Sequence, residues 1–156
     1  MKIRMRKETV RCDKCKNPKD FYYLSDFSYG QRVIYSEKGC IGYINLLEDK
    51  VFSEYVDMAK HLLLKEKETV KEDDIDVFVD KYFGDTCDLI GGIQVDFSFG
   101  QKMCPQCGST AFENIMIEPE KMVDVELAEV THEKWNRLNQ AEKEDMIIKR
   151  IKELKI

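Results

Sequence analysis

The chain has 156 residues, of which 43% are hydrophobic and 35% charged, so it is long enough for one globular domain that buries a sizeable core. Its formal net charge of −5 and pI near 5.2 argue against general binding to a phosphate backbone, which requires clustered lysine and arginine. The N-terminus is charged throughout and every apolar run is short. We therefore expect a cytoplasmic protein with neither a signal peptide nor a membrane span.

Charge is unevenly distributed along the chain. Residues 1–19 hold eight Lys or Arg and two acidic residues, a net charge of +6. Residues 48–88 hold thirteen acidic and six basic residues, and residues 113–133 hold seven acidic and one basic residue. This distribution predicts a basic surface near the N-terminus and acidic surfaces elsewhere.

The first part of the chain favours strands. Residues 1–11 alternate between charged and apolar side chains, which predicts an edge strand, and residues 16–20 supply a turn. Aromatic and β-branched residues then predict a β-hairpin with strands near 27–36 and 40–46. Gly39 would provide the positive φ that its turn needs.

Hydrophobic side chains next recur with the period of a helix. The pattern predicts one helix near 50–67 with Asp49 as its N-cap. A second helix is predicted over 74–83, capped by Asp74 and ended by Gly84.

The last part of the chain contains segments with the two-residue period of a strand and segments with the period of a helix. Strands are predicted at 93–103, 111–118 and 122–130, the first two on either side of the second cysteine pair. Thr131 is expected to cap a short helix, and residues 139–142 form a capping box that opens a final helix.

Two Cys-x-x-Cys pairs, CDKC at 12–15 and CPQCG at 104–108, are the most specific motifs in the sequence. Zinc takes four thiolates in a tetrahedron, and two residues between cysteines let a tight turn direct both sulfurs to one point. Disulfides are rare in the cytosol, and Gly108 permits the left-handed step of such a turn. The pattern therefore predicts one structural zinc ion, bound by Cys12, Cys15, Cys104 and Cys107.

The paired cysteines have two alternatives, redox chemistry and unliganded thiols. A redox pair should open a helix that lowers the thiol pKa, whereas strands and a turn are predicted to follow each pair here. Cys40 and Cys87 have no such neighbour and are expected to pack in the core.

CPQCG at 104–108 resembles the knuckle of zinc-ribbon and rubredoxin-like proteins, and CDKC at 12–15 would be its partner. The resemblance covers about thirty residues and implies that each knuckle joins two strands. We accordingly expect an α+β fold in a single zinc-stabilised domain, residues 1–156. It would consist of a zinc ribbon, a long insertion at about 20–100 with a hairpin and two helices, and a C-terminal helical segment at about 131–156.

The sequence does not predict an enzyme. A closed shell of four thiolates has no open position for water, which argues against metal catalysis. His61 and His132 have no partner motif and are expected at the surface or in packing.

Two kinds of binding protein fit these observations. The first is a non-enzymatic, zinc-stabilised protein that binds a protein partner with a basic surface, such as a toxin-neutralising immunity protein or a similar inhibitor. The acidic segments and the aromatic residues of 21–43 favour it.

The alternative is a nucleic-acid-binding zinc ribbon, with Tyr22 and Tyr23 stacking on bases. A charged edge strand that resists aggregation would show the same pattern. The basic face of the alternative would consist of Arg4, Arg6, Lys7, Arg11, Lys14, Lys16 and Lys19.

Overall fold

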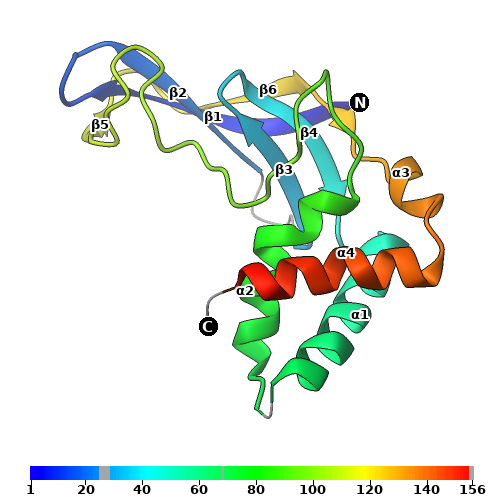
Figure 1. Ribbon diagram of the computed structural model, residues 1–156. Helices are drawn as coiled ribbons and strands as arrows, with labels where there is room; N and C mark the ends of the chain where they lie inside the picture. The colour runs from blue at the N-terminus through cyan, green and yellow to red at the C-terminus, as the bar shows by residue number, and fades with distance from the viewer. Residues whose placement is uncertain (25–28, 68, 155–156) are drawn as a thin grey trace. The chain divides into compact units, whose positions relative to one another are not determined.

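The computed structural model describes residues 1–24, 29–67 and 69–154 (Figure 1). Over these residues the chain has the predicted α+β composition, with two β-sheets and four α-helices. It forms two compact units, each assembled from two separated segments. The knuckle unit consists of Met1–Tyr43 and Phe99–Glu129, and the helical unit consists of Ile44–Ser98 and Val130–Ile156.

The larger sheet of the knuckle unit is built around its first strand. β1 (Lys2–Cys12) pairs antiparallel with β2 (Pro18–Leu24) on one side. On the other side it pairs antiparallel with both β5 (Phe112–Met116) and β6 (Lys121–Glu126) (Figure 1). The two Cys-x-x-Cys pairs therefore lie at one end of this sheet, the first starting at the last residue of β1 and the second preceding β5.

The prediction of an edge strand at residues 1–11 is wrong, because β1 is the central strand of its sheet. The alternating charges that suggested an edge face acidic residues of β6 instead. Arg4 lies opposite Asp124, and Lys2 lies opposite Glu126. Opposite charges at cross-strand positions stabilise a sheet, so the same pattern suits a central strand.

The smaller sheet contains the predicted hairpin. β3 (Gln31–Ser36) and β4 (Gly39–Asn45) are adjacent, and β7 (Ala128–Glu129) pairs in parallel with β4. Gly39 has a φ of +99°, which confirms its predicted role in the turn. The predicted start of the hairpin at residues 27–28 lies outside the described residues.

An apolar core joins the two sheets of the knuckle unit. Met5, Val33 and Leu127 form its buried cluster. Because the cluster takes one residue from each of three separate segments, it ties the N-terminal strand to the hairpin and to the end of β6. Partly buried side chains surround it: Ile3, Tyr22, Leu24, Tyr35, Cys40, Tyr43 and Val125.

The helical unit contains the four helices that the sequence predicts. They are α1 (Lys50–Glu66), α2 (Glu72–Tyr82), α3 (Glu133–Asn136) and α4 (Gln140–Glu153), and a short 3₁₀ helix, η1 (Phe83–Thr86), continues α2. Among the described residues, no helix is both long enough and apolar enough to cross a bilayer.

Two of the predicted helix caps are confirmed and one is shifted. The Asp49 side chain accepts the N–H of Phe52 at 2.8 Å, and residues 139–142 form the capping box of α4. α2 begins two residues earlier than predicted, with Lys71 as its N-cap. Asp74 therefore lies within the helix and accepts the Lys71 N–H at 3.1 Å.

The predicted cap of α3 is wrong. The Thr131 hydroxyl does not cap the helix but donates to Asp88 at 2.6 Å. The Asp88 carboxylate accepts the N–H groups of Glu133 and Lys134 at 2.8 and 3.0 Å. The hydrogen bond from Thr131, followed by those from the helix, lowers the pKa of Asp88.

Residues 93–103 do not form the predicted strand. A single bridge between Ile90 and Ile93 replaces it. Val95 is buried against η1, so close that a Cβ added to Gly84 would lie 2.2 Å from the Val95 carbonyl oxygen. The alternating pattern thus reflects burial of an irregular segment rather than pairing with a strand.

Aromatic rings form the core of the helical unit. The Tyr55 ring lies at its centre, with centroids 5.5 Å from Phe83, 5.8 Å from Trp135 and 6.3 Å from Phe78. Such pairs contribute beyond the apolar area that they bury. The helical unit therefore has a large core of its own.

Candidate metal centre

The two cysteine pairs meet in the knuckle unit, as the sequence predicts. Cys12 Sγ lies 3.6 Å from Cys107 Sγ, and Cys15 Sγ lies 3.6 Å from Cys104 Sγ. All four sulfurs lie within 4.8 Å of one another. A tetrahedron with metal–sulfur bonds of 2.3 Å has sulfur–sulfur edges of about 3.8 Å. The cluster can therefore hold one metal ion.

Both knuckles have the same backbone conformation. The Cys12 carbonyl accepts the N–H of Lys16 at 3.0 Å, and the Cys104 carbonyl accepts the N–H of Gly108 at 2.8 Å. Lys16 has a φ of +63°, close to the +74° of Gly108. The left-handed backbone conformation costs a residue other than glycine about 1–2 kcal/mol, so the first knuckle adopts this turn although lysine occupies the position.

The knuckles also connect the strands that carry them. The N–H of Asp13, in the first knuckle, donates to the carbonyl of Ala111 at 3.0 Å, just before β5. The β1–β5 register shifts between Val10 and Cys12. The end of the sheet is thus irregular, and the cysteine cluster lies where regular strand pairing stops.

Hydrogen bonds to sulfur prepare one thiol in each knuckle for metal binding. The N–H of Cys15 is the main cause that lowers the pKa of Cys12 to about 6. Burial raises the pKa of Cys104, but N–H groups of Cys107 and Gln106 outweigh it and the net shift is downward. Thiolates are the metal-binding form, so these contacts favour coordination.

The pKa of the Cys107 thiol shifts in the opposite direction from those of Cys12 and Cys104. The N–H of Ser109 lowers the pKa of Cys107, but burial and the other three thiols raise it more, to about 11. Four thiols packed this closely cannot all ionise without a cation between them. A divalent metal ion would remove that repulsion, so the donor set fits such an ion.

Basic residues of the alternative nucleic-acid face are engaged in ion pairs. Arg4 lies 3.4 Å from Asp124, and Arg6 lies 3.3 Å from Glu8 and 3.8 Å from Glu120. Acidic side chains therefore stand among these arginines, which weakens their attraction for phosphate.

The remaining residues of that face do not converge on one platform. Register places Tyr23 opposite Arg6 and Tyr22 opposite Lys7, so the two tyrosines point to opposite faces of the sheet. Lys16 pairs with Asp13 at 3.6 Å, within the first knuckle. Arg11 and Lys14 are exposed, and Lys7 and Lys19 are partly buried.

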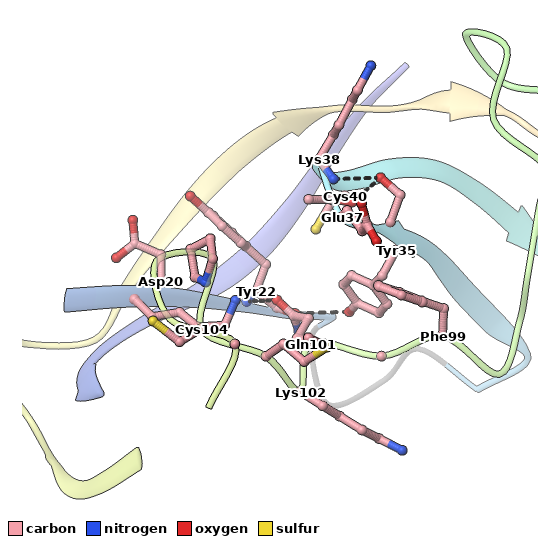
Figure 2. Close-up of a pocket in the computed structure, with 17 residues that line it drawn as sticks. Asp20, Tyr22, Tyr35, Glu37, Lys38, Cys40, Phe99, Gln101, Lys102 and Cys104 are labelled. Atoms are coloured by element: carbon pink, nitrogen blue, oxygen red, sulfur yellow. Dashed lines mark hydrogen bonds between the residues drawn. The ribbon is translucent and has the colours of Figure 1, made fainter. Parts of the chain in front are cut away.

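A pocket of about 570 Å³ adjoins the second knuckle (Figure 2). Gln101 closes one side by pairing with the Tyr22 backbone, accepting its N–H at 2.8 Å and donating to its carbonyl at 2.6 Å. The Tyr35 hydroxyl donates to the same carbonyl at 3.0 Å. Cys104 also lines the pocket, so one wall belongs to the metal centre.

The two unpaired cysteines have different surroundings. Cys87 is buried in the helical unit, as predicted, and Cys40 is only half-buried because it lines the pocket. Burial raises the pKa of Cys40 to about 11, which keeps its thiol protonated and unreactive at neutral pH. Sequence periodicity carries no signal for this pocket, because its walls come from segments about sixty residues apart.

The histidines occupy the kinds of position that the sequence predicts. His61 is exposed, and His132 is buried. His132 Nε2 lies 2.8 Å from the Asp49 carboxylate, and Nδ1 lies 3.1 Å from the Thr86 hydroxyl. Thr86 is 1% exposed and its hydroxyl donates to the Phe83 carbonyl, so this network lies in the interior of the helical unit.

No protein-family model, curated protein or solved structure matches this chain. Its class is therefore defined by its own site, an α+β chain in which two Cys-x-x-Cys knuckles from distant segments form one potential metal centre.

Proposed function

We propose that this chain is a zinc-stabilised, non-enzymatic binding protein whose target is another protein. The observation that carries the proposal is the closed cluster of four sulfurs, contributed by segments almost ninety residues apart. Because all four positions of a tetrahedral ion would be filled by protein, the ion would support the fold and leave no site for a substrate or water.

Zinc is the metal that this donor set favours. Four thiolates in a tetrahedron select zinc or iron, and knuckles of this kind are typical of structural zinc sites. Iron would give the purified protein a visible absorption band, whereas a zinc protein is colourless.

Cobalt substitution tests the metal assignment. The cobalt-loaded protein should show the intense visible bands of a tetrahedral thiolate site. Cys104→Ser should remove or strongly shift them, and Cys40→Ser should leave them unchanged, because Cys40 lies outside the cluster. An octahedral spectrum, or an equal effect of both variants, would contradict the assignment.

Three features support a protein partner with a basic surface. The helical unit carries nineteen acidic and thirteen basic residues, a net charge of −6, which would attract such a partner. Exposed apolar side chains occur on the knuckle unit. The ion pairs of Arg4 and Arg6 disfavour nucleic acid. A toxin-neutralising immunity protein, or a similar inhibitor acting in the cytoplasm, is the type that we propose.

Affinity purification from the native cytosol, with metal retained, tests the partner. A stoichiometric protein, released by salt, is the expected result. Failure to recover one, together with oligonucleotide binding that falls steeply with salt, would favour the nucleic-acid alternative.

A further inference from the structure

The outer edge of β5 combines open strand pairing with exposed apolar side chains. In the described part of the chain, β5 pairs with β1 alone. Three successive residues at its end are large, apolar and exposed: Ile115 by 77%, Met116 by 43% and Ile117 by 39%. Exposed edges of this kind readily pair with another strand.

The backbone hydrogen bonds show which groups point away from the sheet. The N–H of Ile117 donates to the Thr9 carbonyl at 3.0 Å, so Ile117 faces β1. Met116 is paired directly opposite Val10, and neighbouring residues of a strand alternate in direction. The N–H and carbonyl of Met116 therefore point outward, where an added strand would meet them.

Acidic residues flank this edge. Residues 112–120 contain Glu113, Glu118 and Glu120 and no lysine or arginine. Lys16 lies 3.9 Å from Glu113 and Arg6 lies 3.8 Å from Glu120, so these two acids are partly compensated and Glu118 contributes most of the negative charge. A strand added here would lie about 4.8 Å from β5 and about twice as far from β1, and the charge of Glu118 favours a basic segment.

A second copy of this chain fits the edge poorly. Two β5 edges would bring the acidic residues of both copies together, and like charges opposite each other destabilise strand pairing. Pro119 further limits how far such pairing could extend. The acidic residues thus protect the edge from self-association while leaving it open to a basic partner.

The two knuckles hold this edge in place. β5 begins five residues after Cys107, and the Asp13 N–H reaches Ala111 at 3.0 Å from the first knuckle. The β1–β5 register is irregular near Cys12, so strand pairing alone anchors β5 weakly.

From these observations we infer that residues 112–117 are a docking edge for an extended, basic segment of a partner protein, which adds to the sheet as a strand next to β5. The inference rests on the proposed function and specifies the surface and the partner chemistry. Backbone hydrogen bonds would supply affinity, and the exposed isoleucines together with the flanking acids would supply selectivity.

Synthetic peptides provide the test. The probe is a nine-residue peptide that alternates lysine with valine, and its controls are the same peptide with glutamate for lysine and one with alternate amides N-methylated. The metal-loaded protein should bind the lysine peptide, and NMR hydrogen exchange should show new protection at the Met116 N–H. The Ile117 N–H is already bonded, so its protection should change little. Neither control peptide nor chelated protein should produce this effect.

Matched variants distinguish peptide binding at this edge from non-specific binding elsewhere on the surface. Ile115→Ser should weaken lysine-peptide binding about tenfold, whereas Val77→Ser, at a residue of the helical unit that is 62% exposed, should not. Glu118→Lys should reverse the preference toward the glutamate peptide. Asp57→Lys on exposed α1 surface is its charge control.

In experiments on the protein and peptides alone, three results would overturn the inference: equal binding of lysine and glutamate peptides, no change at Met116, or dimerisation through this edge in sedimentation. A native partner bound equally well by the Ile115→Ser variant would overturn the docking edge and leave the proposed function intact. Peptide binding at Met116 without any native protein partner would leave the edge intact and contradict the function.

Discussion

The knuckle unit and the helical unit differ in how they are stabilised. Of the buried hydrophobic residues among those described, seventeen belong to the helical unit and six to the knuckle unit, and two of those six are Cys12 and Cys104. The units are similar in length. A small core usually needs a metal or crosslink in addition, so we expect an ion bound by the cysteine cluster to stabilise the knuckle unit and to matter little for the helical unit.

Metal removal should give the largest difference between the units. Structural zinc contributes on the order of 10 kcal/mol of apparent binding free energy in small folds, so a chelator or Cys104→Ser should unfold the knuckle unit. Trp135 is the single tryptophan and is buried in the helical unit, so its fluorescence should stay that of a buried ring. Amide NMR of both units, recorded with and without chelator, checks this. Loss of both sets of signals together would contradict independent stabilisation.

A core substitution in the helical unit should destabilise that unit and leave the knuckle unit folded. Phe78 is fully buried against Tyr55, so Phe78→Ala should lower the free energy of unfolding of the helical unit by about 3–5 kcal/mol. Urea unfolding followed by Trp135 fluorescence measures this. Metal content should remain that of the wild type, and metal loss would show that the units do not fold separately.

The Asp49 carboxylate should matter more than its place at a helix end suggests. It caps α1 and also contacts buried His132, so Asp49→Ala removes a cap and leaves a buried ring nitrogen unpaired. The two effects together should cost about 2–4 kcal/mol. Asp57→Ala, on the exposed face of the same helix, should change stability by less than about 0.5 kcal/mol. Similar values for both variants would contradict the network.

The two knuckles should respond oppositely to small changes. Lys16→Gly relieves a left-handed backbone and should stabilise the metal-loaded knuckle unit by up to about 1 kcal/mol. Gly108→Ala should destabilise it by about 1 kcal/mol through backbone strain, because an added Cβ would have only ordinary contact with Met103. Thermal melts at saturating zinc measure both. Destabilisation by Lys16→Gly would contradict the matched geometry.

Local signals in the sequence predicted the features that depend on local chemistry. The spacing of the cysteines identified the cluster, and the 3.6-residue period with Asp49 and Asn139 located two helix starts. The helix starts and each separate knuckle depend on neighbours a few residues away, which the sequence displays directly. That the two knuckles meet was predictable because four thiolates complete one zinc site.

Distant strand pairing and distant helix capping were not predictable. β1 becomes central because β6 joins it from more than a hundred residues away, and nothing in residues 1–11 encodes that pairing. β2 begins at Pro18, inside a stretch with the composition of a turn. Asp88 caps α3 from over forty residues upstream. In each case tertiary contacts override the local pattern.

The most direct test is the metal-to-chain ratio, measured by native mass spectrometry on protein purified without chelator. The wild type should carry one zinc ion per chain, and Cys12→Ser and Cys104→Ser should each abolish tight binding, because each removes one ligand of a shared ion. A wild-type chain without metal, or an ion retained by the intact pair in both variants, would contradict a centre shared by the two knuckles.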